Sequence, residues 1–121
     1  MALGPVGQIH ISVRDIDRSV AFYRDVLGIA FLFQVPNQPM AFFSSGAVRL
    51  YLGVPESADF TTKVLLYFTV DDIEAEQARL TALGVQFTDQ PHVVHRDAEG
   101  ELWMSAFHDP DNHNLVLMQQ R

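Results

Sequence analysis

His10 is the side chain in this sequence that is best suited to acid–base chemistry. It lies in the stretch 8–13, where polar residues alternate with apolar ones. Alternation with a period of two is typical of a strand with one buried face, so His10 and Ser12 are predicted to share the open face. Histidine changes charge near neutral pH and can act as a general base or as a hydrogen-bonding contact to a ligand. The alternative is that neighbouring polar side chains simply satisfy its ring nitrogens.

A second stretch, 66–74, repeats the order of residue types in 9–17 with a shift of 57 positions. Tyr67 takes the place of His10, and Thr69 takes the place of Ser12. Their hydroxyl groups can donate or accept hydrogen bonds, so both are candidate ligand contacts. Mutual hydrogen bonding within a polar patch is an equally good interpretation. The repeat also indicates that one structural unit occurs twice in the chain.

A strand, a helix and three further strands in each half would position these side chains. The first half has patterns for a strand at 6–13, a helix at 17–27 and strands at 29–35, 40–44 and 48–52. The second half has patterns for a strand at 64–70, a helix at 72–83 and strands at 85–88, 101–107 and 114–118, with an exposed polar stretch at 89–100. A glycine follows each helix, as is common where a helix ends in a left-handed turn. The order β-α-β-β-β, written twice, indicates an α+β fold with two tandem modules.

The length and composition fit one domain over residues 1–121, with module one at about 5–57, module two at about 63–121 and a linker at about 53–62. Fifteen acidic against eight basic residues give a net charge of −7. This balance argues against nucleic acid as a partner, because binding a phosphate backbone needs clustered Lys and Arg. No apolar run approaches the roughly 20 residues of a membrane span, and no secretion signal is recognisable. The absence of cysteine excludes disulfides and thiol chemistry and fits the cytoplasmic location that we expect.

Several short motifs carry a resemblance to a known family. They are HISVRD at 10–15, SVAFY at 19–23, VLG at 26–28, VDDI at 70–73 and FHDPDN at 107–112. With the paired β-α-β-β-β repeat, the chain resembles the vicinal oxygen chelate superfamily, which includes glyoxalase I, extradiol dioxygenases, and the bleomycin and fosfomycin resistance proteins. The resemblance covers essentially the whole chain. It implies curved mixed sheets around a ligand cleft, helices on the outer faces, a small-molecule ligand and a homodimer.

The resemblance also implies four cleft-facing strand positions, which hold a divalent metal in enzymes such as glyoxalase I. Here they fall on His10, Leu50, Tyr67 and Val116, with Tyr51 in place of Leu50 if the register of that strand differs by one residue. Leucine and valine have no donor atom, whereas zinc or iron requires three or four donors. We therefore expect no metal and no other cofactor. The predicted ligand contacts are His10, Ser12, Leu50, Tyr67, Thr69, Met104 and Val116.

The remaining histidines fit functional roles less well. His92 and His95 have H-x-x-H spacing but no third donor fixed nearby, so we expect them in a solvated loop. His108 and His113 flank the Asp-Pro-Asp turn and are predicted to lie at the rim of the cleft. By alternation with Met104, Trp103 and Phe107 are assigned to the helix side of their strand.

Three functions remain open at this point. The first is a metal-free small-molecule-binding protein of the glyoxalase and bleomycin-resistance type, which could also be a metal-independent enzyme that uses His10 for proton transfer. The second is a divalent-metal-dependent lyase, isomerase or dioxygenase of the glyoxalase I type. The third is an interaction domain whose cleft is filled by Leu50, Met104 and Val116.

Overall fold

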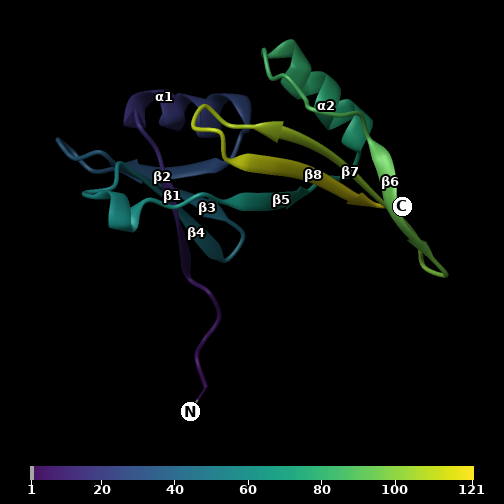
Figure 1. Ribbon diagram of the computed structural model, residues 1–121, viewed down its shortest axis with the longest axis horizontal. Coiled ribbons are helices and arrows are strands. Elements are labelled where there is room, and N and C mark those ends of the chain that lie inside the picture. The colour runs from purple at the N-terminus through teal and green to yellow at the C-terminus, as the bar shows by residue number, and fades with distance from the viewer. Residues whose placement is uncertain (1) are drawn as a thin grey trace. The chain divides into compact units, whose positions relative to one another are not determined.

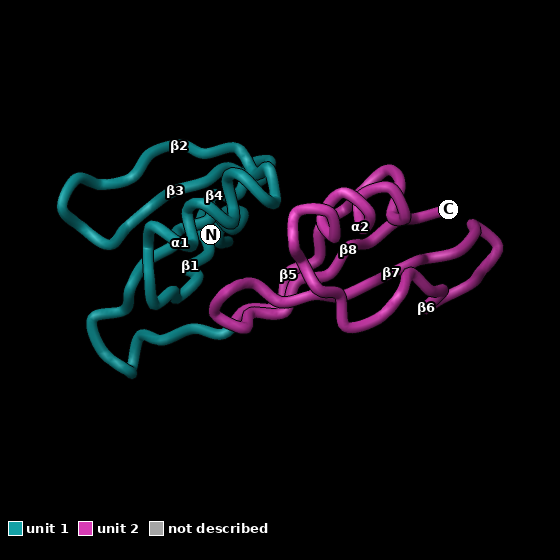
Figure 2. Tube along the Cα trace, turned by 90° about the horizontal axis from the view of Figure 1, so that it is seen from above, with its two compact units in different colours: residues 1–63 teal, residues 64–121 magenta. Residues whose placement is uncertain are grey.

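The computed structural model describes residues 2–121, which form two compact units that divide between Lys63 and Val64 (Figure 2). Each unit contains one four-stranded mixed sheet, and a helix follows the first strand of each sheet. This arrangement confirms the α+β fold with two tandem modules. No helix within residues 2–121 is long and apolar enough to cross a membrane.

In unit 1, the sheet has the strand order β1-β4-β3-β2, with β1 parallel to β4 and the other pairs antiparallel. Segment α1 packs against β3 and β4, so one face of this sheet is covered (Figure 1). Ile11, Tyr23, Phe43 and Leu52 are fully buried in this unit. The elements are β1 (Gln8–Ser12), α1 (Ile16–Ala21), η1 (Phe22–Val26), β2 (Ala30–Gln34), β3 (Met40–Ser45), β4 (Val48–Gly53) and η2 (Ala58–Phe60).

The predicted first helix begins and ends close to where the sequence indicated. Asp15 caps α1, because its carboxylate accepts a hydrogen bond from the Arg18 backbone N–H at 3.1 Å. The last turn widens into the π-helical segment η1 and stops at Gly28, which has a φ of 76°. A positive φ is easily adopted by glycine, so the predicted left-handed end of the helix is confirmed.

In unit 2, the sheet has the matching order β5-β8-β7-β6, with β5 parallel to β8. Helix α2 packs against β7 and β8 through the buried residues Ile73 and Leu80 (Figure 1). Asp72 caps α2 as Asp15 caps α1, at the offset that the repeat predicts. The elements are β5 (Leu65–Thr69), α2 (Ile73–Ala82), β6 (His92–Asp97), β7 (Gly100–His108) and β8 (Asn114–Gln120).

The outer strand of unit 2 is β6, where the sequence predicted an exposed loop. The strand predicted at 85–88 makes only an isolated bridge, between Phe87 and Phe107. The reason is the tight turn at 97–100, in which Asp97 pairs with Gly100 and its carboxylate accepts a hydrogen bond from the Glu99 backbone N–H at 2.9 Å. Such a turn brings the residues just before it alongside β7. An edge strand needs no buried face, so its polar composition resembled that of a loop.

Gly100 supports this hairpin by leaving room for the end of the chain. Its φ is 131°, and a Cβ atom there would collide with the backbone carbonyl of Arg121, which pairs with Glu101. We expect Gly100→Ala to lower the free energy of unfolding by about 3 kcal/mol, through backbone strain and loss of this pairing. Urea unfolding followed by circular dichroism measures the change.

Gly46→Ala is the control for this prediction. Gly46 also has a positive φ, 59°, but a Cβ atom would meet nothing within 4 Å. The expected cost is about 1 kcal/mol from the left-handed conformation alone. Equal costs for the two variants would contradict a steric role for Gly100.

Candidate functional site

A row of aromatic rings crosses the open face of the sheet in unit 1. His10, Tyr51, Phe42 and Phe33 come from β1, β4, β3 and β2 and are paired in register. Neighbouring ring centroids are 4.7, 4.9 and 4.7 Å apart, and the Tyr51–Phe42 and Phe42–Phe33 pairs are stacked. These separations lie within the favourable range for ring pairs. Phe42 is only 7% exposed, so the accessible aromatic surface lies at the ends of the row, at Phe33 and at the His10–Tyr51 pair.

The register of β4 corrects one predicted contact. Leu50 is opposite Ile9 and Phe43 and is 3% exposed, whereas Tyr51 is opposite His10. The choice of Leu50 was wrong, and the alternative, Tyr51, is the residue beside His10. Apolar residues occupy almost every position of β4, so alternation could not decide which set faces the helix.

Gly53 allows the Tyr51 ring to pack closely against its own strand. A Cβ atom at Gly53 would be 2.8 Å from the ring atoms Cε1 and Cζ and from the hydroxyl oxygen of Tyr51. Real Cβ atoms do not approach other atoms so closely, so only glycine fits beneath the ring in this position. The direction of the Tyr51 side chain is thus set by the residue two positions later.

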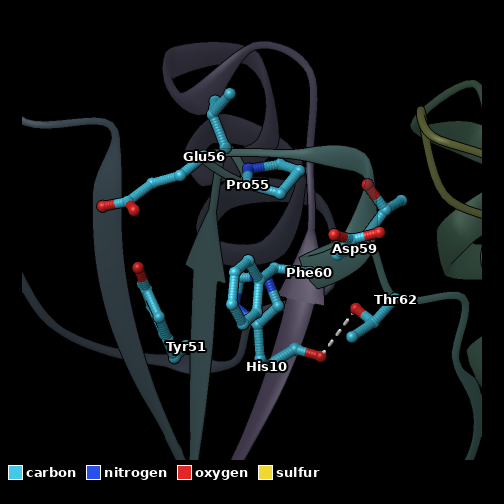
Figure 3. Close-up of a pocket in the computed structure, with 9 residues that line it drawn as sticks. His10, Tyr51, Pro55, Glu56, Asp59, Phe60 and Thr62 are labelled. Atoms are coloured by element: carbon cyan, nitrogen blue, oxygen red, sulfur yellow. Dashed lines mark hydrogen bonds between the residues drawn. The ribbon is translucent and has the colours of Figure 1, made fainter.

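A pocket of about 490 Å³ opens beside the His10 end of the aromatic row (Figure 3). His10 and Tyr51 line it from the strands, and the segment 54–62 lines it from the other side. The segment contributes Val54, Pro55, Glu56, Asp59, Phe60, Thr61 and Thr62. Phe60 is 68% exposed although it is a large apolar residue. A pocket of this size, mainly apolar with a few polar groups, is typical of small-molecule sites.

Thr62 ties this segment to β1. Its hydroxyl donates a hydrogen bond to the His10 carbonyl at 3.0 Å, shown as the dashed line in Figure 3, and accepts one from the Ser12 backbone N–H at 3.1 Å. Its own backbone N–H donates to the Ser12 hydroxyl at 2.7 Å. That hydroxyl also lies 3.1 Å from His10 Nε2. The imidazole is therefore held by the same hydrogen-bond network that holds the loop.

Ser12 has a different place from the one expected. It is 7% exposed and is not among the residues that line the pocket. Its hydroxyl lies within hydrogen-bond distance of both His10 and Thr62. Ser12 therefore holds two pocket residues in place and is not itself part of the pocket surface.

The other predicted contacts lie in unit 2 and share the open face of its sheet. Tyr67 is opposite Val116, and Met118 is opposite both Thr69 and Met104. Tyr67 is 49% exposed, whereas Val116 is 7% exposed. The structure thus groups the predicted residues by module, with Tyr67, Thr69, Met104 and Val116 in one set and His10 and Ser12 in the other.

The helix side of unit 2 holds the residues that were assigned to it. Phe107 is buried, with its ring centroid 4.9 Å from that of Phe87. Arg121 lies 4.3 Å over the Trp103 ring and pairs with Glu74 of α2. The pKa of the Glu74 carboxyl is lowered by this hydrogen bond with the Arg121 guanidinium. These contacts are structural and lie outside the pocket.

Three of the remaining histidines differ from expectation. His92 and His95 are exposed on the edge strand β6, where the side chain of His95 lies 3.2 Å from that of Asp97. His113 is 1% exposed rather than at a rim, and its Nδ1 accepts a hydrogen bond from the Val64 backbone N–H at 3.0 Å. An aspartate-rich turn after a strand gave no sign that its histidine would be buried.

The residues at the metal positions of the family do not fit a metal. They offer one imidazole, His10, two phenols, Tyr51 and Tyr67, and the alkyl side chain of Val116. Zinc and iron sites use three or four nitrogen, oxygen or sulfur donors, and neutral phenols are poor ligands. Across residues 2–121, no group of three or more His, Asp or Glu side chains is arranged to hold a metal ion.

Sequence reasoning missed the part of the site that lies in segment 54–62. The segment was interpreted only as a linker because Pro, Ser, Thr and Asp dominate it. Phe60 is the signal that could have identified this segment, since an exposed aromatic residue in a polar loop often contacts a ligand or another part of the protein. Glu56 and Asp59, which also line the pocket, are ordinary linker residues in sequence and carry no such signal.

Comparison with known proteins agrees with the fold and the motifs. The family model described as "Glyoxalase/Bleomycin resistance protein/Dioxygenase superfamily" matches residues 6–117. The uncharacterized protein YraH of Bacillus subtilis (strain 168) is 29% identical over 122 residues, which cover 90% of this chain and 92% of YraH.

Two solved structures illustrate the range of similar proteins. TnmS3, an antibiotic binding protein from Streptomyces sp. CB03234, matches with a TM-score of 0.79 and 25% identity, covering 100% of this chain and 99% of its own. Lactoylglutathione lyase from Agrobacterium tumefaciens matches with a TM-score of 0.74 and 22% identity. The match covers 98% of this chain and 95% of the lyase chain. Together with the family model, which spans most of the sequence, these matches identify the chain as a member of the glyoxalase/bleomycin resistance protein/dioxygenase superfamily.

Proposed function

We propose that this protein binds a small, flat aromatic molecule without a metal, in the pocket between His10, Tyr51 and segment 54–62. The observation that carries the proposal is the row of stacked rings that ends in this pocket. TnmS3, similar over its whole length, is an antibiotic binding protein, and this supports a binding role. The glyoxalase I type of metal-dependent reaction is not favoured, because the donor set at the corresponding positions is incomplete.

The aromatic rings that line the pocket, those of Tyr51 and Phe60, supply the binding energy in this proposal. A flat ligand that covers about 100 Å² of apolar surface gains about 2.5 kcal/mol from burial. Stacking on the face of an aromatic ring adds about 1 kcal/mol. His10 contributes a contact whose direction is fixed by Ser12 and Thr62. A rigid contact of this kind costs less conformational entropy on binding than a mobile one.

The test is a titration of the full chain with naphthylmethanol, a neutral probe with one flat apolar ring system, in the presence and absence of a chelator. We expect saturable binding with the same affinity in both conditions. Backbone amide chemical shifts should change for His10, Tyr51 and Thr62. Binding that disappears with the chelator would contradict the metal-free proposal, and absence of saturable binding would contradict the proposed function as a whole.

The cytoplasmic location and the homodimer stay predictions. Sedimentation of the purified chain over a range of concentrations measures the oligomeric state. A single monomeric species at every concentration would contradict the predicted homodimer.

A further inference from the structure

We propose that the ligand of this pocket carries a positive charge, so that the protein selects planar aromatic amines in their protonated form. This inference rests on the proposed function and adds the chemical class of the ligand. It arises from two carboxylates, those of Glu56 and Asp59, which line the same pocket as the rings of Tyr51 and Phe60. No lysine or arginine is among the described residues that line the pocket.

The two carboxylates lie on different sides of the pocket. In Figure 3, Glu56 is on the side of the Tyr51 ring, Asp59 is on the side of Thr62, and Phe60 and His10 lie between them. Both acidic residues come from segment 54–62, which Thr62 fixes to β1. A cation that enters between Tyr51 and Phe60 would therefore have a carboxylate within reach on either side.

Neither carboxylate is neutralised within its own unit. Among residues 2–63, Glu56 and Asp59 have no hydrogen bond and no ion pair to another side chain. Arg49 lies on the same face of the sheet, but it is 4.9 Å over the Phe42 ring and donates a hydrogen bond to Gln8 at 2.8 Å. The negative charges that line the pocket are thus available to a ligand.

Ring faces and carboxylates favour the same kind of ligand. The face of an aromatic ring carries negative potential and attracts ammonium groups, and the effect grows as water is excluded. The pair of carboxylates adds a Coulombic attraction that salt screens over about 10 Å at 0.1 M ionic strength. Both acidic side chains are exposed, so the attraction of each one alone is modest. Their sum is expected to make a cation bind about tenfold more tightly than a neutral molecule of the same shape.

Three probes that share one ring system test the inference. They are naphthylmethylamine, which is protonated at neutral pH, naphthylmethanol, which is neutral, and naphthoate, which is an anion. We expect the amine to bind about tenfold more tightly than the alcohol and the anion to bind most weakly. Added salt should weaken binding of the amine and leave binding of the alcohol unchanged.

The variant that tests the assignment is Glu56→Gln combined with Asp59→Asn. It should lower the affinity for the amine to that for the alcohol and leave the affinity for the alcohol unchanged. The control is Asp71→Asn combined with Glu99→Gln, which removes the same charge from exposed positions in unit 2. An equal loss in both double variants would show a general charge effect and overturn the inference.

The two proposals fail in different ways in this experiment. Equal affinities for the amine and the alcohol, both lost in Tyr51→Ala, would overturn the cationic ligand and leave the proposed function in place. Binding of the alcohol that does not depend on Tyr51 would overturn the proposed function itself.

Discussion

Tyr51→Ala is expected to weaken binding of naphthylmethanol by about 2 kcal/mol, which is roughly thirtyfold in the dissociation constant. Tyr51 is the stacked ring that lines the pocket directly, and it connects His10 with Phe42. Its removal takes away aromatic surface that lines the pocket and leaves Phe42 stacked only on Phe33. Isothermal titration calorimetry with purified protein measures the change.

Tyr51→Phe is the matched control, because it keeps the ring and removes only the hydroxyl. We expect it to bind the neutral probe within about a factor of two of the parent, since stacking depends on the ring face. A loss as large as that of Tyr51→Ala would show that the hydroxyl, and not the ring, carries the binding.

Gly53→Ala tests the same ring without changing any residue that lines the pocket. The added Cβ would lie 2.8 Å from the Tyr51 ring, so the ring must turn away, while the rest of the site is retained. The ring end of a tyrosine can move at little cost, and therefore the stability of the fold should change little. A clear loss of affinity at nearly unchanged stability would separate the position of the ring from the integrity of the sheet. Unchanged affinity would contradict a role for the close packing of the Tyr51 ring over Gly53.

The repeat of residue types explains why so much of the fold follows from the sequence. Asp15 and Asp72 cap equivalent helices, as their positions in the repeat required. Such features depend on residues close in sequence, whose preferences are local. The position of β6 was missed because an edge strand needs no apolar face, and its pairing depends on a turn that follows it.

The site was harder to predict than the fold for a physical reason. Strand alternation identified the face that carries His10, but β4 is apolar on both faces, and only the register selects Tyr51 over Leu50. Segment 54–62 becomes part of the site through hydrogen bonds between residues about fifty positions apart, such as Thr62 and Ser12. No local pattern in a sequence encodes such pairing. For the same reason, the available negative charge of Glu56 and Asp59 could not be distinguished from ordinary surface charge.

His113→Ala is expected to lower the free energy of unfolding by about 3 kcal/mol. The imidazole is fully buried, and its Nδ1 accepts the hydrogen bond of the Val64 backbone N–H. Its backbone N–H donates to the buried carboxylate of Asp109 at 2.9 Å, which fixes the turn between β7 and β8. The substitution leaves the Val64 N–H without its acceptor, at a cost of about 1–3 kcal/mol, and creates a cavity of the size of the ring.

His108→Ala and His113→Asn are the control variants for this prediction. His108 is exposed at the end of β7, just before the turn that holds His113, so its loss should change stability by less than about 0.5 kcal/mol. The asparagine side chain offers an oxygen near the position of Nδ1, and it should therefore recover part of the stability that alanine loses. Urea unfolding of the three variants measures the differences. If the histidine at 113 served only to bind a ligand, its removal would leave stability unchanged and asparagine would be no better than alanine. A large, partly rescued loss instead assigns His113 to the hydrogen bond that joins the start of β5 to the turn before β8.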